Sequence, residues 1–193
     1  MRDVKEGIYM ALMIMFALTV FLLGYIFGRT KINKTNRANY VARSAIIATV
    51  YVLITYLFKP ISYGPTQFRI SEVMTLLPLV ESAAVPGLFI GCLIANILGG
   101  LGPWDIFGGS FITLLAAHIT SKLQNPFLGS LPPILLNAFG ISIYLSAIYG
   151  LPYWTTVLYI GVEQFVVIAV IGIPLFYALR GTSLFDLFDK GRN

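Results

Sequence analysis

A few ionisable and amide side chains lie within or beside long apolar stretches, and these residues are the best placed to bind a ligand. Glu163 lies inside one such stretch, Asn96 lies near the end of another, and Glu72 and Asp105 open two more. A carboxylate in apolar surroundings must be paired, protonated or solvated by a cavity. A buried amide without a hydrogen-bond partner is also costly. We therefore expect these side chains to converge on a binding pocket.

The residue types around them suit a flat, nitrogen-rich ligand. Carboxylates accept hydrogen bonds from N–H groups, amides both donate and accept, and aromatic rings stack on planar faces. Thr156, Tyr159 and Glu163 share one helix face at spacings of i, i+3 and i+7. The predicted substrate-binding residues are Arg69, Glu72, Asn96, Trp104, Asp105, Tyr159 and Glu163.

Simpler structural roles are open for several of these residues. Glu72 and Asp105 can each cap the first turn of a helix, and Arg69 can pair with Glu72. Trp104 can anchor a membrane interface. Asn137 is expected to serve helix packing.

No catalytic or metal-binding constellation is visible. The single Cys92 cannot form an internal disulfide, and the single His118 has no clustered Cys, Asp or Glu around it, so neither a metal site nor a cofactor is predicted. There is no nucleophile with a neighbouring base, and we therefore do not expect an enzyme. Glu81 is expected to be solvated at a turn between two helices.

The composition predicts an integral membrane protein. Of 193 residues, 58% are hydrophobic and only 11% are charged, whereas soluble domains have about 25% charged residues. The mean hydropathy is +0.84. This composition excludes a soluble enzyme, a disordered chain and a disulfide scaffold. No alternation typical of β-barrel strands is present, so the fold class is an all-α membrane bundle.

Charge-free segments define the expected membrane spans, because a helix needs about 20 apolar residues to cross a bilayer. Small residues on one face of one of these helices, namely Gly87, Gly91, Ala95 and Gly99, predict close packing against a neighbour. Leu151 and Pro152 separate the last two spans. Seven spans are expected, over residues 8–28, 41–58, 70–80, 84–99, 105–121, 131–149 and 154–179.

The positive charges indicate the orientation in the membrane and not a nucleic-acid partner. Basic residues of cytoplasmic loops outnumber those outside. Seven spans then place the C-terminus in the cytoplasm and the N-terminus outside, with 8–28 as an uncleaved span instead of a signal peptide. The basic residues that indicate the cytoplasmic side are Arg29, Lys31, Lys34, Arg37, Arg43, Lys122, Arg180, Lys190 and Arg192.

Several segments between residues 41 and 180 resemble the QueT transporter family. The most specific are Pro60-Ile61-Ser62-Tyr63-Gly64-Pro65-Thr66-Gln67-Phe68-Arg69-Ile70-Ser71-Glu72 and Pro86-Gly87-Leu88-Phe89-Ile90-Gly91-Cys92-Leu93-Ile94-Ala95-Asn96. Weaker ones are Leu114-Leu115-Ala116-Ala117 and Gly172-Ile173-Pro174-Leu175-Phe176-Tyr177-Ala178-Leu179.

The resemblance implies the substrate-binding S component of an energy-coupling factor (ECF) transporter for queuosine precursors, which are 7-deazaguanine bases. Such a component would be a six-helix bundle over 41–180, here preceded by an extra helix and basic loop over 1–40 and followed by a cytoplasmic tail over 181–193. It would dock on a membrane coupling subunit that is driven by two cytoplasmic ATPases in other chains. The resemblance places the coupling-subunit contact at Ala42, Ala45 and Thr49.

Other functions are open from the residues alone. The sequence has no P-loop motif GxxxxGK[ST], so uphill transport would need a partner or an ion gradient. A standalone gradient-driven carrier or oligomeric channel is one alternative, and an S component for riboflavin, thiamine or biotin is another. A non-transport membrane subunit or intramembrane enzyme is a third.

Overall fold

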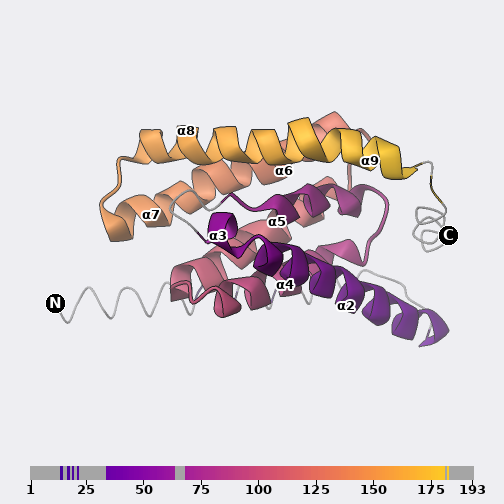
Figure 1. Ribbon diagram of the computed structural model, residues 1–193. Helices are drawn as coiled ribbons and strands as arrows, with labels where there is room; N and C mark the ends of the chain where they lie inside the picture. Colours follow the sequence, from indigo (N-terminus) through magenta and orange to yellow (C-terminus); the bar gives the residue numbers. More distant parts are fainter. Residues whose placement is uncertain are drawn as a thin grey trace.

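The computed structural model describes residues 34–63 and 68–180, together with Ile14, Ala17, Thr19, Phe21 and Thr182. The helices pack side by side, with α8 and α9 along one edge of the bundle and α2 and α4 along the opposite edge (Figure 1). In chain order, the helical elements are α2 (Lys34–Leu57), α3 (Lys59–Ser62), the 3₁₀ helix η1 (Ile70–Leu79), α4 (Ala84–Leu98), the π-helix η2 (Trp104–Gly109), α5 (Ser110–Thr120), α6 (Pro126–Leu136), the π-helix η3 (Asn137–Ile141), α7 (Ser142–Tyr149), α8 (Tyr153–Gln164), the π-helix η4 (Phe165–Gly172) and α9 (Ile173–Arg180).

The predicted all-α class is confirmed for the described residues, which contain no strand. Each span predicted between residues 41 and 179 coincides with helical structure. Within the described part of the chain, three continuous helices are long and apolar enough to cross a membrane, namely Arg37–Leu57, Pro126–Tyr149 and Tyr153–Arg180, whereas Ile70–Leu79 and Ala84–Leu98 are shorter. The full count of six spans plus one is therefore not established. The predicted helix over 8–28 and the tail over 181–193 lie outside the described residues, apart from the isolated positions named above.

One helix begins earlier than the sequence suggested. The predicted span 131–149 starts at Pro126, because Asn125 caps the helix: its side-chain oxygen accepts a hydrogen bond from the backbone N–H of Phe127 at 2.8 Å. Proline is well suited to the first turn of a helix, where its missing N–H removes no intrahelical bond. At the other end, Gly150 closes the helix in the left-handed conformation, and α8 begins after Pro152 as predicted.

Helices α2 and α4 approach each other closely along the predicted small-residue face. A Cβ added to Gly91 would lie 2.9 Å from the Cβ of Tyr51 and 3.1 Å from the carbonyl oxygen of Ala48. A Cβ added to Gly87 would lie 2.9 Å from the carbonyl oxygen of Ser44. The predicted packing role of these two glycines is confirmed, since only glycine allows the two backbones to come this near.

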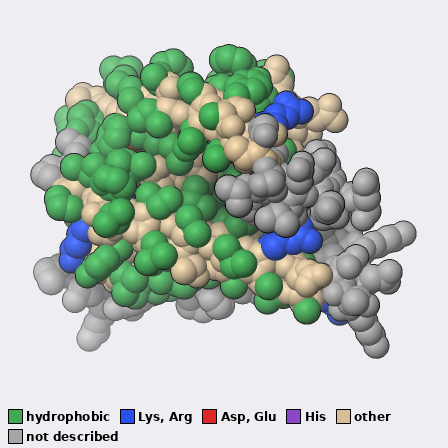
Figure 2. Space-filling model, turned by 45° about the vertical axis from the view of Figure 1, so that its right-hand side comes forward, with side chains coloured by type: hydrophobic (Ala, Val, Ile, Leu, Met, Phe, Trp, Pro, Cys, Tyr) green, Lys and Arg blue, Asp and Glu red, His purple; other side chains and the backbone are tan. Residues whose placement is uncertain are grey.

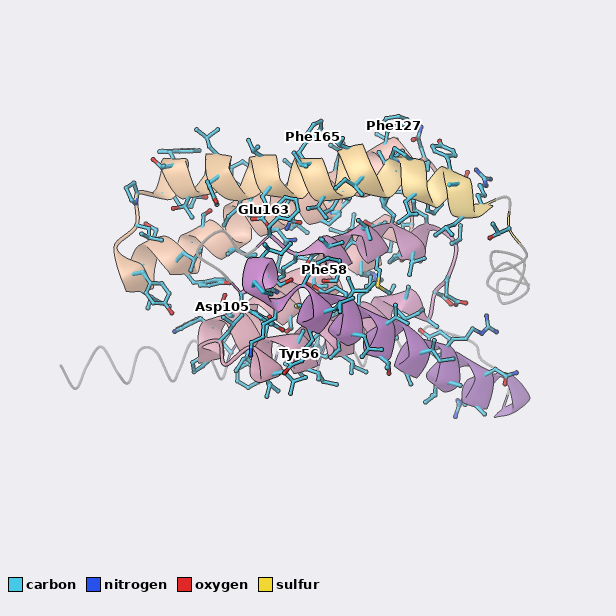
Figure 3. The ribbon with its side chains drawn as sticks, viewed as in Figure 1. Tyr56, Phe58, Asp105, Phe127, Glu163 and Phe165 are labelled. Carbon is cyan, nitrogen blue, oxygen red and sulfur yellow. The ribbon has the colours of Figure 1, made fainter. Side chains whose placement is uncertain are left out.

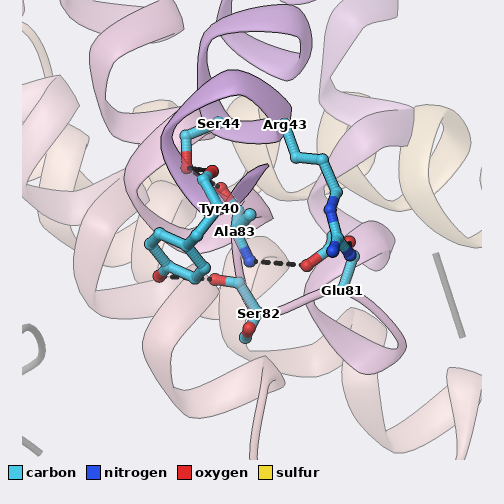
Figure 4. A network of polar contacts seen from close by, with 6 residues as sticks. All are labelled: Tyr40, Arg43, Ser44, Glu81, Ser82 and Ala83. Carbon is cyan, nitrogen blue, oxygen red and sulfur yellow. Dashed lines mark hydrogen bonds and ion pairs between the residues drawn. The ribbon is translucent and has the colours of Figure 1, made fainter. Parts of the chain in front are cut away.

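A polar network joins the first half of α2 to the turn before α4 (Figure 4). Glu81 is only 2% exposed, forms an ion pair with Arg43 at 2.8 Å and accepts a hydrogen bond from the backbone N–H of Ala83. Ser44 donates to the carbonyl oxygen of Ala83, and Tyr40 donates to that of Ser82. The expectation that Glu81 is solvated is therefore wrong, because Arg43 on the neighbouring helix compensates its charge.

The outer surface of the bundle is apolar. Large hydrophobic side chains such as Leu57, Leu158 and Val162 are more than half exposed. The face shown in Figure 2 is mostly hydrophobic, with Lys and Arg at only a few positions. Exposed apolar side chains over a broad face are expected where the solvent is lipid.

The packing of α2 on α4 gives a stability test. We expect Gly91→Ala to lower the free energy of unfolding in detergent by about 1–3 kcal/mol, because the new methyl group meets the α2 backbone. Gly161→Ala in α8 is the matched control, since its Cβ would lie 3.6 Å from the Cβ of Ala138, an ordinary contact. That control should be neutral or stabilising. Equal effects of the two substitutions would contradict the close packing.

Candidate functional site

A cavity of about 280 Å³ lies between the helices at one end of the bundle. Its wall is built by η1, α4, η2 and α5 on the one hand and by η3, α7 and α8 on the other. The cavity brings together six of the seven residues that the sequence suggested for substrate binding, namely Arg69, Glu72, Asn96, Asp105, Tyr159 and Glu163. Trp104 is not among the lining residues, although it adjoins Asp105 in the chain.

Glu72 lies at the start of η1 and is held from α2. Its Oε1 accepts a hydrogen bond from the hydroxyl of Tyr51 at 2.7 Å, and both side chains are buried. Its Oε2 is buried and has no hydrogen-bond partner among the described residues. Since this hydrogen bond comes from a side chain on α2, Glu72 is oriented by packing and not by capping its own helix.

Asn96 lies near the end of α4 and is held by the helix that follows. Its amide nitrogen donates to the backbone carbonyl of Asp105 at 2.6 Å and also contacts the sulfur of Cys92 at 3.6 Å. Its Oδ1 is fully buried and has no partner within the described part of the chain. The amide nitrogen of Asn96 therefore has two acceptors for its hydrogens, while its oxygen Oδ1 accepts no hydrogen bond from the described residues.

Asp105 is held by a contact with the opposite part of the wall. Its Oδ1 accepts a hydrogen bond from the hydroxyl of Tyr144 on α7 at 2.9 Å. The first turn of η2, where Asp105 lies, follows Pro103, and no side chain caps it. Asp105 therefore does not cap its helix; its side chain accepts a hydrogen bond from Tyr144 instead.

Glu163 points from α8 toward the interior of the bundle, whereas Phe165 two residues later points outward (Figure 3). Its Oε1 lies 3.4 Å from the backbone nitrogen of Arg69, which donates a long hydrogen bond. The Arg69 guanidinium is also buried, and its Nη1 lies 3.9 Å from the Cys92 sulfur. Three acidic side chains thus line the cavity beside one arginine, which gives the wall an excess of acidic groups.

A second hollow adjoins the cavity on its lateral side. It is an apolar groove of about 720 Å³ that shares Thr155, Tyr159 and Glu163 with the cavity. The other lining residues are Ile61, Phe68, Leu158, Val162 and Val166.

Several lining residues were not expected from the sequence. Asn137, assigned to helix packing, does join two helices by donating to Gln164 at 2.9 Å, but both residues also line the cavity. Cys92, Thr113 and Tyr144 line it too. Asn137 and Gln164 are amides in otherwise apolar helices, and this signal could have identified them.

The described residues contain no group of three or more His, Cys, Asp and Glu side chains that could hold a metal ion. The residues suggested for contact with a coupling subunit, Ala42, Ala45 and Thr49, all lie exposed on α2. They occupy the face of α2 that points away from α4, since Ser44, Ala48 and Tyr51 are the residues that meet α4.

The Tyr51–Glu72 hydrogen bond can be tested through stability. We expect Tyr51→Phe to lower the free energy of unfolding by about 1–3 kcal/mol, because Glu72 Oε1 would be left buried and unsatisfied. Tyr159→Phe is the control, since Tyr159 is 48% exposed. Chemical unfolding in detergent would measure both, and a neutral Tyr51→Phe would show that the bond does not hold Glu72.

Comparison with known proteins identifies the family. The family model described as QueT transporter matches residues 41–181. The queuosine precursor transporter QueT of Lactococcus lactis subsp. cremoris (strain MG1363) is 33% identical over 97 residues, which is 49% of this chain and 56% of that relative, so the chain spans only about half of the relative's length. No solved structure matches this chain. Both the family and the relative are described as transporters and not as enzymes, and the match over 41–181 shows that the chain belongs to the QueT transporter family.

Proposed function

We propose that this chain binds a queuosine precursor, a 7-deazaguanine base, in the cavity and acts as the substrate-binding subunit for its uptake. The observation that carries the proposal is the pair of unused acceptors, Glu72 Oε2 and Asn96 Oδ1, both buried at the cavity wall without a partner among the described residues. Leaving such an acceptor unsatisfied costs about 1–3 kcal/mol. A base with several N–H groups would satisfy both acceptors.

The rest of the wall supports the same ligand class. Tyr159 lines the cavity and supplies an aromatic face for stacking, while Glu163 and Asp105 provide further acceptors. The cavity of about 280 Å³ is at the small end of ligand pockets, which run from about 300 to 1,000 Å³. This size favours a single bicyclic base over a larger ligand such as riboflavin.

Charge placement supports an outward-facing cavity. Arg37 and Arg43 lie in the first half of α2, which reaches toward the end of the bundle where α9 ends at Arg180 (Figure 1). Lys122 follows α5, whose first residues are next to the cavity. By the positive-inside rule, the basic end is cytoplasmic, and the cavity then opens to the exterior. An N-terminus outside the cell, which requires the span over 8–28, is part of the same proposal.

We propose further that residues 41–180 form the substrate-binding membrane domain and that uptake is energised by other chains. The sequence has no P-loop, and an ECF coupling subunit with two ATPases would supply the energy. The exposed small residues Ala42, Ala45 and Thr49 on α2 would allow a partner helix to approach closely.

Binding can be measured by calorimetry on the purified chain in detergent with 7-deazaguanine. We expect Glu72→Gln, Asn96→Ala and Glu163→Gln each to weaken binding about tenfold or more, because each removes an acceptor from the wall. Asn39→Ala is the matched control, since Asn39 is exposed on the first half of α2. Unchanged affinity in all three cavity variants would exclude this site.

Uptake into vesicles distinguishes the energy sources. Vesicles that contain only this chain should accumulate no 7-deazaguanine, whereas vesicles that also contain a coupling subunit and two ATPases should do so when ATP is supplied. Bulky substitutions at the exposed face, such as Ala45→Trp, should abolish uptake and leave binding intact. Accumulation by the chain alone in an ion gradient would instead favour a standalone carrier.

A further inference from the structure

A pair of hydrogen-bonded amides forms part of the cavity wall away from Glu72 and Asn96. The Asn137 amide nitrogen donates to Gln164 Oε1 at 2.9 Å, and the two side chains are 3% and 5% exposed. Both residues line the cavity, Asn137 from η3 and Gln164 from the end of α8. The two amides therefore face the same space as the proposed ligand.

Each amide has a second hydrogen-bonding group that the mutual bond does not use. The unused groups are the acceptor Oδ1 of Asn137 and the donor Nε2 of Gln164, and neither has a hydrogen bond to another described residue. Neither atom belongs to the fully buried unsatisfied atoms of the described chain, and the cavity is the space that both residues line. The pair consequently presents one acceptor beside one donor.

Both residues lie where an α-helix passes into a π-helix. Asn137 is the first residue of the π-helix Asn137–Ile141, and Gln164 directly precedes the π-helix Phe165–Gly172. Such π segments change the direction in which side chains leave a helix and often occur at functional sites. An amide pair that served helix packing alone would need neither π segment nor a position at a cavity.

We propose that Asn137 and Gln164 together read an amide-like edge of the bound base, in which a ring N–H lies next to a ring carbonyl. Asn137 Oδ1 accepts from the ring N–H, and Gln164 Nε2 donates to the carbonyl oxygen. In 7-deazaguanine this edge is formed by N1–H and O6. The inference rests on the proposed function and adds to it the residues that select the edge.

The test compares 7-deazaguanine with its 6-O-methyl ether, which has neither the N1–H nor the carbonyl. We expect the wild-type chain to bind the ether about tenfold or more weakly. In Gln164→Met the affinity for 7-deazaguanine should fall by a similar factor, and the preference over the ether should nearly disappear. Gln124→Met, at an exposed position outside the helices, is the matched control and should keep the preference.

Gln164→Glu separates edge reading from helix packing. A glutamate at this position still accepts the hydrogen bond from Asn137, so the helices stay joined, but it presents an acceptor in place of the Nε2 donor. We expect this variant to fold and to bind 7-deazaguanine about tenfold or more weakly than wild type.

The outcomes are distinguishable. An unchanged affinity in Gln164→Glu, or an unchanged preference in Gln164→Met, would overturn the edge-reading role while leaving the proposed function intact. Failure of the wild-type chain to bind 7-deazaguanine at all would contradict the proposed function and this inference with it.

Discussion

The close approach of α2 and α4 at Gly87 and Gly91 is the contact on which the cavity depends. It buries Tyr51 completely against α4, where the Tyr51 hydroxyl can reach Glu72. In lipid there is no hydrophobic drive between helices, so close backbone packing and hydrogen bonds must hold them together. The glycines thus fix a helix pair, and the helix pair fixes a carboxylate at the cavity wall.

The cavity is surrounded by a partly completed set of hydrogen bonds. Asn96 is held by the Asp105 carbonyl, and Asp105 is held by Tyr144, so each polar side chain is oriented by the next. Glu72 and Asn96 each keep one acceptor without a partner in the described chain. In a network that served stability alone, every buried polar group would be expected to have a hydrogen-bond partner, because unsatisfied buried groups are costly. The open acceptors are better explained by a ligand that completes the set.

The sequence predicted the helical class and the approximate position of the longer helical segments between residues 41 and 179, because charge-free segments and flanking prolines mark them locally. It also identified six of the cavity residues, including all three acidic ones, since ionisable groups in apolar segments are rare enough to stand out. Glu81 was misjudged because its partner Arg43 lies on another helix. Asn137 was assigned to helix packing alone and Gln164 was not singled out, although amides in apolar helices are a visible signal. That the two bond each other at a cavity depends on how η3 packs on α8. Both errors concern side chains whose partners lie on another helix, and local sequence patterns do not reveal such partners.

The excess of acidic side chains around Arg69 has a consequence for selectivity. Guanine nucleotides carry a base much like the proposed ligand, but they also carry phosphate groups. Moving a phosphate from water into this small cavity would be costly, because Arg69 is the only basic side chain among the lining residues and three carboxyl groups lie beside it. The wall would thus act as an electrostatic filter that admits a free base and turns away the far more common nucleotides.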